Sequence, residues 1–198
     1  ELIGHDRNPI SDPSGDQSPR SIDVVGGDDG TGTSFSAGYW FYNETTDELF
    51  FRMRLSEQPN RLTNVWQILF ETDGDPGVDW VLQLEGSGGS GVELVQATTE
   101  GPNYNNVVLA ANGSWSGAAN TYARFDSTHV GSAFGNGNDV FLDLAIPFGE
   151  LSSTASPNFS SVTGLTASDG FRVAITTSTT HQGINKEAPG TLSLSSTV

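Results

Sequence analysis

The chain of 198 residues contains no cysteine and very few cationic residues. The absence of cysteine excludes disulfide bonds, thiolate metal sites and a cysteine nucleophile. Eight Lys and Arg stand against 24 Asp and Glu, which gives a formal net charge of −16 at pH 7. No apolar run approaches the length of about 20 residues that a membrane-spanning helix needs. A field this negative repels nucleic acid and anionic lipid and attracts divalent cations, so we expect no nucleic-acid partner and no membrane insertion.

Apolar residues recur with a period of two instead of the helical period of 3.6. In the segment Glu48–Leu55, Leu and Phe alternate with residues that include Arg52 and Arg54. This pattern predicts a strand with one buried face, as in antiparallel sheets. The two arginines are predicted on the outer face, where they favour carboxylate partners on a neighbouring strand.

Turn signals every eight to twelve residues separate about ten to twelve short β segments. We therefore predict an all-β fold, an antiparallel β-sandwich of jelly-roll type. Ser21–Val25 is expected to be a strand, and Pro147–Leu151 is expected to form one helical turn. The composition does not change along the chain in a way that would divide it, so residues 1–198 are predicted to be a single domain.

An acidic turn, Thr72–Trp80, lies between two apolar segments that are predicted to be strands. It carries Asp73, Asp75 and Asp79. Carboxylates so close together repel one another unless a cation lies among them, and hard oxygen ligands in a loop suit Ca²⁺. The alternative is a solvated hairpin turn, because Asp and Gly are common turn residues. The turn is not an EF-hand, since the twelfth position from Asp73 is Leu84 instead of Glu.

A second group of carboxylates lies near the start of the chain, within eighteen positions. We predict a second calcium site here, with a solvated loop as the alternative. Its candidate ligands are Asp12, Asp16, Asp23, Asp28 and Asp29.

No set of residues with catalytic spacing is visible. The three histidines, His5, His129 and His181, are scattered and do not have the spacing of a zinc site. A nucleophile elbow needs a glycine two positions after its serine, and two positions after Ser90 the residue is Val92. Glu71 and Asp73 are close in sequence, but the cation site explains them better than glycoside hydrolysis does. We therefore expect that the protein is not an enzyme.

Several segments follow one another along the chain in a characteristic order: Asp12–Asp16, Glu48–Leu55, Thr72–Asp75, Ala145–Pro147, Thr177–Thr180 and Asn185–Lys186. This order resembles that of secreted prokaryotic β-sandwich domains that carry acidic calcium loops. The resemblance implies structural calcium and an extracellular or cell-surface location. The chain is also similar in kind to calcium-bound jelly-roll subunits of extracellular filaments and tubes, in which a terminal segment completes a neighbour's sheet.

These features favour a calcium-stabilised structural protein that assembles with copies of itself into a filament, tube or coat. In an extended tail, Leu192, Leu194 and Val198 would share one face and could fill a groove in a neighbour by strand addition. Residues 1–10 or 189–198 are the candidates for such exchange. The alternative is that the tail is the last strand of its own sheet.

A carbohydrate-binding module or an adhesin domain is the alternative function. Flat aromatic rings on a sheet face or at a loop edge would form the platform for a glycan. Trp115 is the best candidate for an exposed ring, because its neighbours are small and polar. The full set of candidates is Trp40, Tyr42, Tyr104 and Trp115, and for most of them the alternative is a place in the core.

Overall fold

The computed structural model describes twelve strands and one short 3-10 turn. The described residues are 10–46, 48–59, 63–71, 78–85, 91–97, 106–108, 114–115, 123–128, 130–134, 139–147, 172–180, 183 and 186. The strands are β1 (Gly27–Asp28), β2 (Ser34–Phe35), β3 (Gly38–Asn43), β4 (Glu48–Leu55), β5 (Val65–Glu71), β6 (Trp80–Glu85), β7 (Gly91–Ala97), β8 (Asn106–Val108), β9 (Ser114–Trp115), β10 (Ala123–Asp126), β11 (Val140–Pro147) and β12 (Arg172–Ser178).

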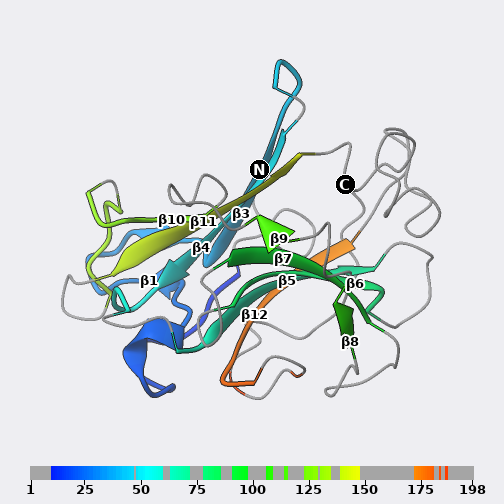
Figure 1. The fold of residues 1–198 in the computed structure, drawn as a ribbon. Helices are drawn as coiled ribbons and strands as arrows, with labels where there is room; N and C mark the ends of the chain where they lie inside the picture. Colours follow the sequence, from blue (N-terminus) through cyan, green and yellow to red (C-terminus); the bar gives the residue numbers. More distant parts are fainter. Residues whose placement is uncertain are drawn as a thin grey trace.

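Two large antiparallel sheets lie one above the other, as Figure 1 shows. The smaller sheet has the order β10-β11-β4-β3, and the larger has the order β12-β5-β6-β7-β8, with β9 also paired to β7. Strands β4 and β11 pair in one sheet, while the strands that follow them, β5 and β12, pair in the other. The predicted antiparallel β-sandwich is confirmed, although this strand order does not establish a jelly roll.

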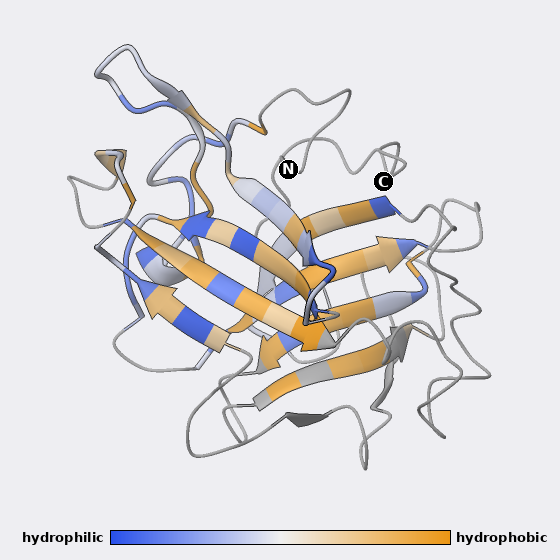
Figure 2. Cartoon of the chain, turned by 90° about the horizontal axis from the view of Figure 1, so that it is seen from above, coloured by the Kyte–Doolittle hydropathy of each residue, from blue (hydrophilic) through white to orange (hydrophobic). Residues whose placement is uncertain are grey.

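The core lies between the two sheets. Alternate residues of β4, among them Phe51, face alternate residues of β5, among them Phe70, and both rings are buried. Their centroids are 5.4 Å apart with the planes nearly perpendicular, a favourable edge-to-face geometry. Figure 2 shows hydrophobic and hydrophilic residues alternating along β4 and β10, whereas β11 is mostly hydrophobic. One face of the smaller sheet is therefore buried in the core.

The larger sheet is buried on its other face as well. Leu69, Val81 and Val95 form a second cluster there, fully shielded from solvent. Beside it, Gln67 donates to Gln83 at 3.3 Å and accepts from the Thr176 hydroxyl at 3.0 Å. Among the described residues, Gln67, Gln83 and Thr176 have no buried side-chain N or O atom without a hydrogen-bond partner, so these polar groups can be buried at little cost. By contrast, the outer face of the smaller sheet carries large side chains that are exposed to solvent, such as Phe41.

The prediction of a strand over Ser21–Val25 is wrong. Residues Arg20–Ile22 form a 3-10 turn, and Val24 then makes an isolated bridge to Leu55. The cause is competition for backbone carbonyls by side chains of the larger sheet. The Trp66 indole donates to the Ser21 carbonyl at 2.8 Å, and the Thr177 hydroxyl donates to the Ile22 carbonyl at 2.8 Å.

The predicted helical turn at Pro147–Leu151 is described only at its first residue. Pro147 is the last residue of β11, and the rest of the predicted helical turn at 148–151 lies outside the described residues. In the part of the chain that the structure describes, no helix is long and apolar enough to cross a membrane.

Candidate binding groove on the smaller sheet

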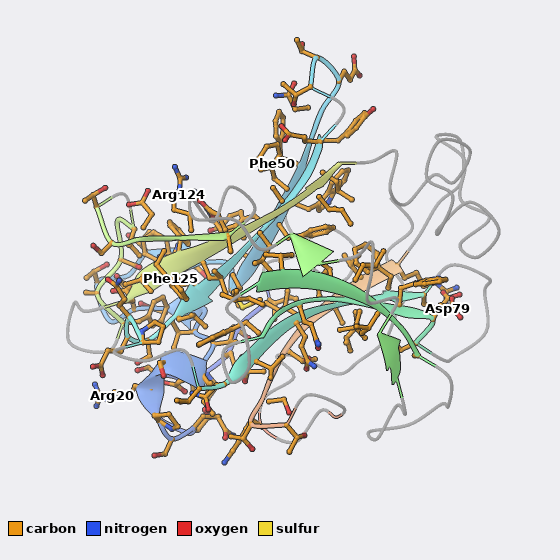
Figure 3. All side chains as sticks on the ribbon, in the orientation of Figure 1. Arg20, Phe50, Asp79, Arg124 and Phe125 are labelled. Atoms are coloured by element: carbon orange, nitrogen blue, oxygen red, sulfur yellow. The ribbon has the colours of Figure 1, made fainter. Side chains whose placement is uncertain are left out.

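Strand pairing places four side chains in one straight row across the outer face of the smaller sheet. Tyr39 on β3 is opposite Arg52 on β4, which is opposite Asp143 on β11, which is opposite Arg124 on β10. Since side chains alternate between the faces of a strand, all four point away from the core. Figure 3 shows the alternation on β10, where Arg124 points outward and the next residue, Phe125, points toward the larger sheet.

The centre of the row is a charge cluster. Arg52 Nε and Nη2 donate to the two oxygens of Asp143 at 2.5 and 2.8 Å. Arg124 Nη2 donates to the same carboxylate at 2.7 Å, while 67% of its side chain stays exposed. The hydrogen bond to Asp143 raises the pKa of Arg52 above its usual range. The predicted carboxylate partner of Arg52 is thus confirmed, and it binds the guanidinium through two parallel bonds.

An aromatic row lies on one side of this cluster. Phe41 on β3 is opposite Phe50 on β4, with ring centroids 6.3 Å apart and planes tilted by 35°. Phe41 is 60% exposed, and among the described residues it is the large hydrophobic side chain that meets solvent most. Figure 1 shows that β3 and β4 extend beyond the body of the sandwich, and Figure 3 places Phe50 on this extension.

A buried arginine closes the other side. Arg54, 1% exposed, lies between two rings, with its guanidinium carbon 4.9 Å from the Phe35 centroid and 4.4 Å from that of Phe141. Its Nη1 donates to the Val130 carbonyl at 3.0 Å and lies 3.5 Å from Asp139. The Ser132 hydroxyl connects them, accepting from Arg54 and donating to Asp139. This arrangement fixes the 130–134 loop against the sheet.

Together the rows line an open groove with a volume of about 600 Å³. Aromatic faces alternate with hydrogen-bond donors and acceptors along it, so it can hold a ligand that is apolar on its flat faces and polar at its edges. The lining residues are Phe35, Tyr39, Trp40, Phe41, Phe50, Phe51, Arg52, Arg54, Arg124, Val130, Phe141 and Asp143.

Most of the aromatic residues predicted from the sequence to bind a glycan do not line this groove. Trp40 and Tyr42 are partly buried and pack against the core, although Trp40 also touches the groove. Trp115 lies in β9, paired with β7, and nothing is described of its side chain, while Tyr104 lies outside the described residues. The rings on the outer face of β3 are those of Tyr39, which is partly buried, and Phe41, which is exposed. The alternation of residues in β3 predicts that Tyr39 and Phe41 share one face of the strand. It does not predict whether that face or the opposite one is buried in the core.

Asp23 organises the first acidic loop through the backbone. Its two carboxylate oxygens accept the amides of Gly15 at 2.7 Å and Gln17 at 3.3 Å, and the residue is fully buried. Burial raises the pKa of Asp23, the Gly15 amide opposes this, and the nearby Asp16 side chain raises it further. Asp12 lies on the same side of the fold and is bridged to Gly26 by two backbone hydrogen bonds.

The next two aspartates also accept backbone amides. Asp28 accepts from Gly30 at 2.8 Å and from Gly32 at 3.2 Å. Asp29 accepts the Thr31 hydroxyl at 2.6 Å, and its other oxygen accepts the Ala133 amide at 3.0 Å. The Thr31 hydroxyl is the main reason that the pKa of Asp29 is lowered. These bonds tie the 28–33 loop to the loop that closes the groove, a common use of Asp in turns.

Asp12, Asp16, Asp23, Asp28, Asp29 and Asp79 are the predicted metal ligands that the structure describes, and it does not gather three of them around one point. Within the described ranges, no group of three or more His, Asp or Glu is placed to hold a metal ion. Asp79 is described, and its backbone joins β5 to β7 through Phe70 and Ala97. Asp73 and Asp75, like the tail residues Leu192, Leu194 and Val198 and the terminal segments 1–9 and 189–198, lie outside the described residues.

Comparison with protein-family models, with curated proteins and with solved structures gave no match. The resemblance to secreted calcium-binding sandwiches is therefore not supported by any relative, and function must be argued from the groove itself.

Proposed function

We propose that the protein is a carbohydrate-binding domain, without enzymatic activity, that holds a glycan in the groove of the smaller sheet. The observation that carries the proposal is the pairing of an exposed ring, Phe41, with the row Tyr39–Arg52–Asp143–Arg124. The strands that hold these residues are paired along their length, so the site is formed before a ligand arrives and little ordering is needed on binding.

The chemistry of a sugar matches this surface. A pyranose ring has an apolar C–H face, which packs on an aromatic ring, and hydroxyls at its edge, which both donate and accept. Arg52 and Arg124 supply donors, and Asp143 supplies acceptor oxygens between them. Neighbouring hydroxyls could therefore bond to an arginine and to the aspartate at once. Such sites are typically mostly apolar with a few fixed polar groups.

Replacing Phe41 by Ala is expected to weaken binding of the retained polysaccharide by at least roughly tenfold, equal to about 1.4 kcal/mol. The fold should remain, because Phe41 is 60% exposed. Affinity electrophoresis against a panel of soluble polysaccharides measures the effect. Thr45→Ala, at the exposed tip of the same hairpin, is the control and should bind as wild type. Equal retention of Phe41→Ala and wild type would contradict the platform.

A second function, a calcium-stabilised extracellular subunit that assembles with itself, is favoured by one feature. Strand β3 is an edge of the smaller sheet in the described part of the chain, with β4 on one side only. An edge strand offers free backbone groups to an added strand, such as residues 189–198 of another copy. Calcium bound by the 72–80 turn would contribute its binding energy to the folded subunit.

Light scattering tests this second function. On adding calcium to protein held in chelator, we expect growth from monomer to large particles, because neutralised carboxylates no longer repel between subunits. Asp75→Asn should need more calcium for the same growth. A monomer of unchanged size in both conditions would exclude calcium-driven assembly.

A further inference from the structure

The groove carries a charge that is opposite to that of the chain. Its lining includes three arginines and one aspartate, whereas the protein has only eight Lys and Arg and a net charge of −16. Arg54 is balanced by Asp139, which lies beneath it at 3.5 Å. Arg52 and Arg124 share the single carboxylate of Asp143. The centre of the row therefore has one positive charge more than it has negative charges.

One further carboxylate on this face, that of Asp126, lies outside the row. Asp126, on β10, is opposite Phe141, and each is two residues along its strand from the Arg124–Asp143 pair. Its Oδ1 accepts the amide of Thr128 at 2.8 Å and the hydroxyl of the same residue at 2.7 Å, so that oxygen is directed to its own loop. Asp126 does attract Arg52 at longer range.

Arg124 is the residue that can use the excess. Within the described part of the chain its recorded ion pair uses Nη2 alone, and 67% of its side chain is exposed. The remaining guanidinium N–H groups face solvent at the rim of the groove. A guanidinium presents its donors as a planar fork that fits a carboxylate with two parallel hydrogen bonds. The β10 end of the row thus offers donors for a carboxylate, and Phe41 lies on β3, with β11 and β4 between them.

From this geometry we infer that the glycan is acidic, a polysaccharide of uronic acids in which the carboxylate of one sugar residue binds Arg124 while the ring of another sugar residue packs on Phe41. The inference rests on the proposed carbohydrate-binding function and names its ligand class. Sequence composition alone argues against a polyanion, because the net charge repels one. At 0.15 M salt, however, the Debye length is about 8 Å, so distant carboxylates are screened while contacts inside the groove are not.

The test compares two ligands with the same ring and different charge: polygalacturonate and its methyl ester, at 0.15 M salt. Wild type should bind polygalacturonate at least roughly tenfold more tightly than the ester, and Arg124→Gln should lose that preference while still binding the ester. Arg20→Gln, which removes the same charge from the 3-10 turn on the opposite side of the body (Figure 3), is the control and should keep the preference.

The outcomes separate the inference from the function on which it rests. Equal binding of the two polymers, with Phe41→Ala weakening both, would overturn the acidic ligand and keep the carbohydrate-binding domain. A preference that Arg124→Gln leaves intact would also overturn the assignment. Absence of binding to any polysaccharide of the panel would overturn the proposed function itself.

Discussion

Replacing Arg54 by Met is expected to lower the free energy of unfolding by about 3–5 kcal/mol, because it leaves the Asp139 charge buried without its partner. Both side chains are 1% exposed, so water cannot replace the lost contact. The Asp139 carboxylate has few other contacts that could stabilise its charge, since its Oδ1 is buried with no hydrogen bond among the described residues. The Met side chain fills most of the space between the rings of Phe35 and Phe141, so the loss is mainly electrostatic. Urea unfolding measures it.

Two further variants show whether charge is the cause. Arg124→Met makes the same substitution in an ion pair on the same sheet, but the Arg124 side chain is mostly exposed. It should lower the free energy of unfolding by only about 0–1 kcal/mol. The double variant Arg54→Met/Asp139→Asn removes both buried charges and should recover most of the loss. If it is as unstable as Arg54→Met alone, packing of the arginine between the rings is the larger contribution, and the electrostatic explanation is wrong.

The alternation of residues was enough to predict the faces of the strands, and with them the antiparallel sheets. In Glu48–Leu55 it placed Arg52 and Arg54 together on the outer face, which the structure confirms. It could not distinguish their surroundings. Arg52 remains partly exposed beside Asp143, whereas Arg54 is covered by Phe35 and the 130–134 loop, segments distant in sequence. Local periodicity contains no information on which loop covers a given side chain.

The groove was missed for a related reason. Its polar row depends on the registers of three strand pairs, β3 with β4, β4 with β11 and β11 with β10. Register joins Arg52 to Asp143 across 91 positions of sequence, and no pattern within one segment reveals it. Closeness in sequence also does not show what an acidic side chain binds. Asp28 and Asp29 are close in sequence, which suggested a metal site, and in the structure their oxygens accept amides of their own loop and its neighbour.

Trp66→Ala is the other substitution with a large expected effect, because Trp66 joins three parts of the fold. Its ring is fully buried and contacts the ring of Phe125 on the opposite sheet, with centroids 5.7 Å apart. Its indole donates to the Ser21 carbonyl and so holds the 3-10 turn. Loss of the ring should cost about 3–5 kcal/mol. The stranded carbonyl adds about 1–3 kcal/mol if no water reaches it.

Trp66→Phe separates these two contributions and connects stability to the groove. It keeps an aromatic ring against Phe125 and removes the indole donor, so its loss in urea unfolding should be clearly smaller than that of Trp66→Ala. Phe125 and Arg124 are neighbours on β10 that face opposite sides of the sheet (Figure 3), so the core contact fixes the strand that carries the groove arginine. Trp66→Phe should therefore bind polysaccharide as wild type does. Weaker binding by a variant that is still fully folded would show that the indole hydrogen bond, far from the groove, controls the position of β10.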